Sequence, residues 1–116
     1  MAKEYVFIDE WDVDAPQEAV FDALADPTRR HLVEALASRD SASATALAAD
    51  LPISRQAVAK HLSALASAGL VRSHRSGRET LYELQPAPLA DAADWIAEVG
   101  TEWDDRLARL QRLLKK

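Results

Sequence analysis

The hydrophobic residues of this chain change their spacing at Gly69, and this change most restricts the folds open to it. Before Gly69, apolar residues recur every three or four positions, as they do on one face of an α-helix. After it, residues 70–75 and 79–84 alternate between apolar and polar, as in β-strands. Ser76 and Gly77 stand between the two strands and favour a tight turn, because glycine readily adopts positive φ. A helical region is therefore predicted to lead directly into a β-hairpin.

Two helices are predicted at the start of the helical region. Asp14 stands three residues before Gln17, which is the spacing of a capping box. Asp26 and Pro27 combine an N-cap residue with a proline suited to the first helical turn, and this second helix is expected to end near residues 38–40. The buried residues predicted for the two helices are Val20, Phe21, Leu24, Leu32, Val33 and Leu36.

Two further helices are separated by Pro52. The first spans residues 44–51, and Pro52 ends it. Ser54 is a favourable N-cap for the second helix, residues 54–68, and Gly69 is expected to end that helix as a C-terminal cap. The apolar faces consist of Ala44, Leu47, Ala48 and Leu51 on the first helix and Val58, Leu62 and Leu65 on the second.

A short alanine-rich helix, a turn, a second helix and a hairpin together make a winged helix-turn-helix. Ala44 and Ala48 are small enough for the two helices to cross closely, so that the second helix projects from the body. The predicted fold is mainly α with a small β-hairpin wing at 70–84, built as one domain over residues 15–116. Residues 1–14 are expected to form a separate N-terminal arm or strand. The alternation of its apolar residues favours a strand that packs on the body or across a dimer, with disorder as the alternative.

A last long helix is predicted over residues 87–114. Pro86 and Pro88 end the hairpin and open this helix. Its apolar residues give more surface than a chain of 116 residues can easily cover from within. We therefore expect a dimerisation helix that pairs with a second copy. The apolar positions are Leu89, Ala92, Ile96, Val99, Trp103, Leu107, Leu110 and Leu114.

Positive charge is concentrated in one part of an acidic chain. The formal net charge is −5, yet residues 51–78 contain five basic residues and no Asp or Glu. Residues 1–26 contain eight acidic residues against Lys3 alone. A basic stripe on the second helix and the wing is the electrostatic pattern of a nucleic-acid binder, although a solvated face can also produce it. The stripe consists of Arg55, Lys60, Arg72, Arg75 and Arg78.

The predicted recognition helix, residues 54–68, carries polar side chains suited to the DNA major groove. Arg55 can donate two hydrogen bonds to guanine, and Gln56 can pair with adenine in the same bidentate way. Lys60 lies one turn further on and suits a phosphate. Arg75 and Arg78 at the hairpin tip can reach the DNA backbone or minor groove. The predicted DNA-binding residues are Ser54, Arg55, Gln56, Ala59, Lys60, Ser63, Arg75 and Arg78.

Several segments together resemble the ArsR family of bacterial transcriptional regulators. They are residues 21–30 (FDALADPTRR), 54–62 (SRQAVAKHL), 68–71 (AGLV), 76–78 (SGR) and 81–84 (LYEL), within a resemblance that covers roughly residues 17–114. The resemblance implies a homodimeric repressor that binds double-stranded DNA at a partly palindromic operator. It also implies that the first and last helices form the dimer interface, for which we expect Val20, Phe21, Leu89, Trp95, Ile96, Val99, Trp103, Leu107 and Leu110.

The sequence departs from the metal-sensing members of that family. Those members carry a Cys-x-Cys motif on the helix equivalent to residues 44–51, and this chain has no cysteine. Others use histidine on the last helix, where this chain has none. His31, His61 and His74 are scattered, and Asp91, Asp94 and Glu98 are interpreted as a solvated edge. No metal and no cofactor are therefore expected, and the inducing signal is not specified by these residues.

Three alternatives remain at the level of sequence. The winged helix can bind protein or RNA without recognising a DNA sequence. The chain can also respond to an unknown small-molecule effector through a pocket lined by Phe21, Trp95 and Trp103. An enzyme is the weakest alternative, because no nucleophile with an activating partner and no phosphate-binding loop is present. Without cysteine, a secretory signal or an apolar run of membrane-spanning length, we expect a cytoplasmic protein that does not enter a membrane.

Overall fold

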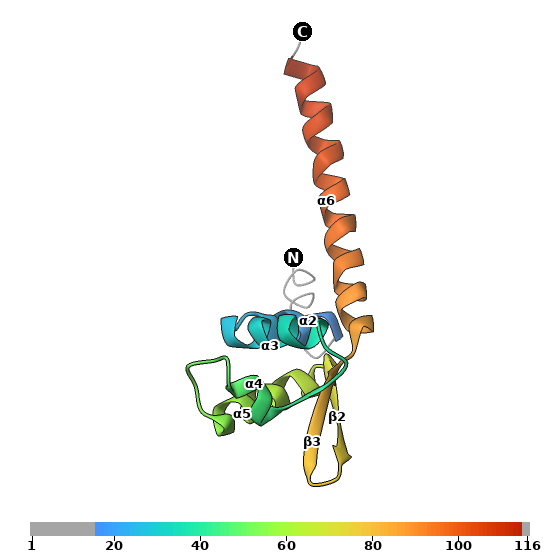
Figure 1. The fold of residues 1–116 in the computed structure, drawn as a ribbon. Coiled ribbons are helices and arrows are strands. Elements are labelled where there is room, and N and C mark those ends of the chain that lie inside the picture. The colour runs from blue at the N-terminus through green and yellow to red at the C-terminus, as the bar shows by residue number, and fades with distance from the viewer. Residues whose placement is uncertain (1–15, 115–116) are drawn as a thin grey trace, which may run out of the picture.

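The computed structural model describes residues 16–114, and the predictions for residues 1–14, including the arm and the Asp14 cap, lie outside them. Two helices, α2 (Pro16–Leu24) and α3 (Pro27–Ala37), come first, followed by a short strand β1 (Ala42–Ser43). Helices α4 (Ala44–Ala48) and α5 (Arg55–Ser67) form the helix-turn-helix pair. Strands β2 (Val71–Ser76) and β3 (Glu79–Leu84) form the wing, and α6 (Pro86–Leu114) ends the described chain. Figure 1 shows the wing and α6 extending from the helical body in opposite directions.

The connection between α2 and α3 explains the Asp-Pro-Thr-Arg-Arg sequence. The Asp26 carboxylate accepts hydrogen bonds from the Thr28 and Arg29 amides at 2.7 and 3.2 Å, which confirms the predicted N-cap. Arg29 Nε and Arg30 Nη1 each donate to a carbonyl at the end of α2, at 2.6 Å. These hydrogen bonds give partners to two amides at the start of α3 and to two carbonyls at the end of α2. The backbone groups at a helix terminus need such partners because they have none within the helix.

Helix α4 is shorter than predicted. It ends at Ala48, whereas the apolar spacing predicted a helix that continued to Leu51. Pro52 explains why Leu51 is not helical, because proline disfavours the helical conformation in the residue before it. Leu51 nevertheless packs against the core from the turn, where its amide donates to the Ala48 carbonyl at 3.1 Å.

Helix α5 begins and ends where its capping residues predicted. Ser54 Oγ accepts a hydrogen bond from the Ala57 amide at 3.1 Å and forms the N-cap. Gly69 adopts φ +79°, a conformation that glycine tolerates best. The amides of Gly69 and Leu70 donate to carbonyls in the last turn of α5, which closes the helix in the usual C-terminal manner.

The wing is the antiparallel hairpin that the alternating pattern predicted. Its register pairs Val71 with Leu84 and Ser76 with Glu79. The two turn residues are therefore Gly77 and Arg78, not Ser76 and Gly77 as predicted. Gly77 has φ +64°, as the first turn position of a type II′ hairpin requires. Strand β1 adds a third strand on β3, which the sequence analysis missed because two residues show no periodicity.

The core lies between α2, α3, α5 and the start of the wing. Its fully buried side chains are less than 2% exposed, and most occupy positions that helical spacing predicted. Phe21, Leu24 and Val33 lie only partly buried at its edge. Of the α6 residues, Ala92 alone is fully buried in the described chain, so α6 is anchored mainly at its N-terminal end. The largest core residues are Val20, Leu32, Leu36, Val58, Leu62, Leu65 and Leu70.

Candidate nucleic-acid interface

Helix α5 has one anchored face and one open face. Val58, Leu62 and Leu65 are 0% exposed and fix the helix to the core. The opposite face presents the residues that sequence analysis assigned to DNA. Of these, Ala59 is partly buried, and the exposed ones are Ser54, Arg55, Gln56, Lys60 and Ser63. A rigidly held helix with an open polar face and a free N-terminal turn has the form that enters a major groove.

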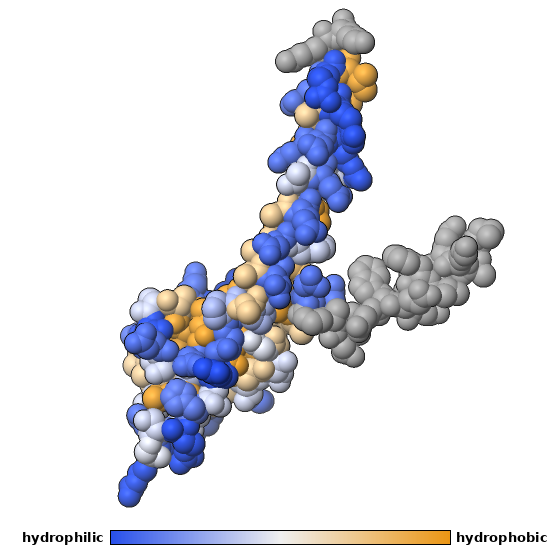
Figure 2. Space-filling view, turned by 90° about the vertical axis from the view of Figure 1, so that its right-hand side faces the viewer, coloured by the Kyte–Doolittle hydropathy of each residue, from blue (hydrophilic) through white to orange (hydrophobic). Residues whose placement is uncertain are grey.

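The wing carries the second group of basic residues. Arg75 lies near the end of β2 and Arg78 lies in the turn, and both are exposed. In Figure 2 hydrophilic residues cover the projecting lower tip of the molecule, where Figure 1 places the hairpin. Glu79 follows Arg78 directly and is also exposed, so it reduces the positive charge at the tip. The sequence pattern indicated only a strand residue at this position.

Arg72 differs from the other basic residues of the stripe. Its Nε lies 2.6 Å from Glu83 Oε1 on the neighbouring strand, and the two residues are register partners. This ion pair neutralises Arg72 within the wing. Within residues 16–114, the four remaining basic residues of the stripe form no ion pair with a carboxylate, so their charges face the solvent. They are Arg55, Lys60, Arg75 and Arg78.

Helix α6 leaves a row of large apolar side chains uncovered. Trp95, Ile96 and Trp103 are 46%, 55% and 56% exposed, and hydrophobic residues continue to the end of the helix. In Figure 2 patches of hydrophobic residues are visible along one edge of the projecting helix, which is otherwise largely hydrophilic. Leu113, which sequence analysis did not single out, is also exposed. The remaining exposed members are Leu107, Leu110, Leu113 and Leu114.

Some residues assigned to the dimer interface have partners within the protomer. Val20 is 1% exposed and belongs to the core, so it has almost no surface to offer a second copy, contrary to our prediction. The Phe21 ring lies 5.5 Å from the Trp95 ring, centroid to centroid. Leu89 and Val99 are partly buried. The sequence spacing identified the apolar positions. It did not distinguish the residues that are buried within the protomer from those that stay exposed.

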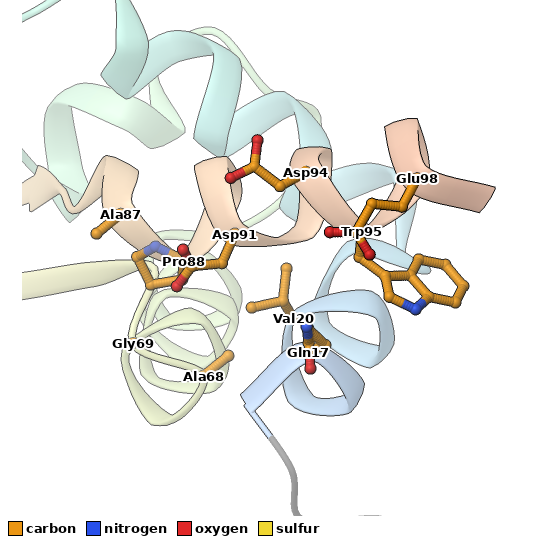
Figure 3. Close-up of a pocket in the computed structure, with 10 residues that line it drawn as sticks. All are labelled: Gln17, Val20, Ala68, Gly69, Ala87, Pro88, Asp91, Asp94, Trp95 and Glu98. Carbon is orange, nitrogen blue, oxygen red and sulfur yellow. The ribbon is translucent and has the colours of Figure 1, made fainter. Parts of the chain in front are cut away.

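A groove of about 560 Å³ lies where α2, the end of α5 and the start of α6 meet. In Figure 3 its apolar floor includes Val20 and Pro88, and Trp95 forms one wall. Three carboxylates also line the groove: Asp91, Asp94 and Glu98. Of the three residues predicted to line an effector pocket, one lines this groove. Trp95 lines the groove, but Trp103 and Phe21 do not.

Comparison with known proteins agrees with this geometry. A helix-turn-helix domain model matches residues 24–74, which run from the end of α2 into the wing. The HTH-type transcriptional regulator YuzN of Bacillus subtilis, itself uncharacterized, is 40% identical over 87 residues, which cover 69% of this chain and 95% of YuzN. The structure of an ArsR-like transcriptional regulator from Rhodococcus sp. RHA1 is 44% identical with a TM-score of 0.73, covering 87% of this chain and 94% of that chain. The chain belongs to the ArsR family of transcriptional regulators.

Another relative of this ArsR-family chain has a more specific description. SdpR of Bacillus subtilis, a transcriptional repressor, is 32% identical over 88 residues, covering 76% of this chain and 97% of SdpR. Membership of the ArsR family assigns a DNA-binding helix-turn-helix to the chain and places it among regulators rather than enzymes. The mainly helical winged fold that the sequence predicted is confirmed.

The histidine and acidic residues of this ArsR-family chain are dispersed over its described part. Among residues 16–114, no three His, Cys, Asp or Glu side chains lie close enough together to bind one. His31 Nδ1 lies 3.6 Å from Glu34, one turn away on the same helix. His61 lies near enough to Asp26 to act on its pKa. No helix in the same part of the chain has the length and apolar character needed to cross a membrane.

Proposed function

We propose that the chain acts as a homodimeric repressor that binds a partly palindromic operator. The observation that carries the proposal is the arrangement of α5 and the wing. A core-anchored helix presents exposed Arg55, Gln56 and Lys60, and the hairpin beside it presents exposed Arg75 and Arg78. The repressor SdpR among the relatives supports repression, and the uncovered apolar row of α6 supports a dimer.

The proposed contacts divide into two classes. Arg55 and Gln56 lie in the first turn of α5, where a recognition helix meets base edges, and they would determine sequence preference. Lys60, Arg75 and Arg78 would neutralise phosphates and set the register without recognising a sequence. Repression would follow from occlusion of a promoter by the bound dimer.

The direct test is a titration of the protein onto the DNA upstream of its own gene and onto an unrelated duplex, at two salt concentrations. Selective binding by two protomers per site supports the proposal. Equal, weak and steeply salt-dependent binding to both duplexes would show phosphate binding without sequence recognition, or an operator located elsewhere. No binding at low salt would contradict DNA binding and favour a protein-binding winged helix.

Two variants separate the two classes of contact. Lys60→Gln should weaken binding to every duplex and reduce the slope of log K against log salt by about one. Gln56→Ala should instead relax the preference at one base pair, by about 1–3 kcal/mol. Arg112→Gln on α6 removes one exposed positive charge away from α5 and is the matched control. An unchanged base preference in Gln56→Ala would refute that assignment.

The groove beside Trp95 supports a second candidate function, regulation by a small molecule. Its volume lies in the range of small-molecule sites, and its three carboxylates favour a cation. Phenethylamine, an aromatic amine without an indole ring, is a suitable probe, with neutral 2-phenylethanol as its control. Saturable quenching of Trp fluorescence by phenethylamine that is lost in Trp95→Phe would support the candidate. Equal, non-saturating quenching by both probes would contradict it.

A further inference from the structure

Strand β2 has one edge without a neighbouring strand. The sheet order is β1-β3-β2, so within residues 16–114 β2 pairs with β3 alone. Its residues from Arg72 to Ser76 are all exposed. The backbone groups along the free edge of such a strand can pair with an added strand, which supplies the missing main-chain hydrogen bonds. The free edge of β2 is therefore suited to an extended segment.

Positive charge surrounds this edge. Residues 71–78, which form β2 and the wing turn, contain three arginines, one histidine and no acidic residue. Arg72 is paired with Glu83, whereas Arg75 and Arg78 form no ion pair with a carboxylate of residues 16–114. Opposite charges attract over this range, so a segment that fits the edge is acidic as well as extended.

The sequence of the N-terminal arm, residues 1–14, has both properties. It contains five acidic residues and one basic residue. It contains neither proline nor glycine, the residues least compatible with a strand. Its apolar residues include an alternating set, which is typical of a strand that covers a surface with one face. The alternating residues are Tyr5, Phe7, Trp11 and Val13.

The arm joins the described chain beside the base of β2. Gln17, the second residue of α2, and Gly69, two residues before β2, line the same groove (Figure 3). An extended chain covers about 3.3 Å per residue, so residues 5–15 can span about 36 Å, whereas six residues of β2 span about 20 Å. The arm is thus long enough to follow β2 to the wing turn. Because β2 runs away from this base and the arm runs toward it, the two would pair antiparallel.

Helix α6 is the other surface within reach of the arm, and its charge disfavours docking there. Residues 91–105 contain six acidic residues and no basic residue, so they repel an acidic segment. Three of these carboxylates line the groove that Gln17 also lines. Of the two surfaces, the β2 edge therefore attracts the arm. The acidic residues are Asp91, Asp94, Glu98, Glu102, Asp104 and Asp105.

We propose that the N-terminal arm adds to the free edge of β2 as an antiparallel strand and inhibits DNA binding by the same chain. The docked arm would place its carboxylates beside Arg75 and Arg78, the wing residues proposed to neutralise phosphates. DNA and the arm would then compete for the same positive charges. The docking rests on the free edge, the reach and the charge, whereas the inhibition also rests on the proposed DNA-binding function.

The strength of the inhibition is set by the fraction of chains whose arm is docked. The apparent affinity for DNA is reduced to the fraction of chains that are free to bind it. If about 90% of the chains have a docked arm, its release should strengthen DNA binding about tenfold.

Spin-label distances test the docking directly, because the chain has no cysteine to interfere. The first pair of labels is placed at Ile8→Cys and Ser76→Cys, and the second at Ile8→Cys and Asp105→Cys. A docked arm should give about 20 Å or less for the first pair, since neighbouring strands lie about 4.8 Å apart. The second pair should be about 45 Å apart, because the wing and α6 extend from the body in opposite directions (Figure 1).

The labelled chain is measured in an excess of unlabelled chain, so that each distance lies within one copy. The short first and long second distance, kept under this dilution, support the docking. A short distance to Asp105 would place the arm on α6, and the absence of a short distance in both pairs would show an arm that does not dock. A short distance to Ser76 that dilution removes would show that the arm comes from a second copy. Each of these three results overturns the inference.

Proline substitutions test the inhibition without changing the charge. Ile8→Pro/Trp11→Pro removes two backbone amides, and the odd spacing of the two positions means that one of them points at β2 in any register. This variant should bind both the DNA upstream of its own gene and an unrelated duplex about tenfold more tightly than the parent protein. Ile8→Val/Trp11→Phe keeps the amides and the strand propensity, and it is the matched control with unchanged affinity. Circular dichroism checks that both variants remain folded.

Failure of the inhibition and failure of DNA binding give different results. Equal or weaker DNA binding by the proline variant, with the parent and control binding normally, would overturn the inhibition. No DNA binding by any of the three proteins would overturn the proposed DNA-binding function together with the inhibition. The label distances are measured without DNA, so they decide the docking in either case.

Discussion

Ser54 has two roles that a pair of substitutions can separate. Its Oγ accepts the Ala57 amide at 3.1 Å and caps α5, and the same exposed residue belongs to the face assigned to DNA. Removing an N-cap typically costs about 1 kcal/mol, so Ser54→Ala should destabilise the protein by that amount. For a domain of this size the melting temperature should fall by about 4 °C.

Ser54→Asp should keep the stability of the protein and weaken its binding to DNA. Aspartate caps as well as serine does, so the free energy of unfolding should stay within a few tenths of a kcal/mol of the parent value. The added carboxylate would face DNA phosphates. At about 4 Å in water its repulsion is about 1 kcal/mol, which weakens DNA binding roughly fivefold. Stability and DNA affinity would thus change independently at one position.

The assays are thermal unfolding followed by circular dichroism and DNA titration followed by fluorescence anisotropy. Ser54→Thr is the control, since it preserves the hydroxyl, the charge and most of the capping energy. If Ser54→Asp were as unstable as Ser54→Ala, the capping argument would be wrong. If it bound DNA like the parent protein, the N-terminal turn of α5 would not face the phosphates.

Three further predictions concern the wing, the core and the α2–α3 connection. Glu79→Gln removes the exposed acid beside the wing turn and should strengthen binding to every DNA duplex about two- to fivefold at low salt. The gain in affinity should fall as salt rises, and an anisotropy titration at two salt concentrations measures it. Leu62→Ala empties a site that is 0% exposed and should lower the free energy of unfolding by about 2–5 kcal/mol in urea titrations; a loss below 1 kcal/mol would mean that α5 is not anchored there. Burial acts to raise the pKa of Asp26, but hydrogen bonds from the Arg29 and Thr28 amides outweigh it, and the pKa lies below its ordinary value of 3.8. The ionised Asp26 carboxylate therefore stabilises the folded protein. Because the folded-state pKa is the lower one, this stabilisation is fully present above the unfolded-state pKa and is lost as pH falls through the folded-state pKa. Unfolding measured between pH 5 and 2 should therefore depend less on pH in Asp26→Asn, and an unchanged pH dependence would contradict the assignment.

The sequence by itself determined the features that neighbouring residues specify. Asp26 and Ser54 cap helices because each side chain reaches an amide two or three residues away. Gly77 permits the hairpin turn through its own backbone angle. The apolar period placed Leu32 and Leu62 in the core without reference to the rest of the chain, since a helix turns its side chains at a fixed angle. The candidate DNA-binding residues could be proposed from the same local information.

Tertiary structure alone decided which distant residues meet. The pairing of β1 with β3 and the ion pair of Arg72 with Glu83 join residues whose separation along the chain gives no periodic signal. Val20 and Trp95 are both apolar helix residues, yet one is 1% exposed and the other 46%. Their difference arises because α6 crosses the body only at its N-terminal end and then leaves it (Figure 1). Periodicity shows which face of a helix is apolar, whereas the packing of the whole chain determines how much of that face is covered.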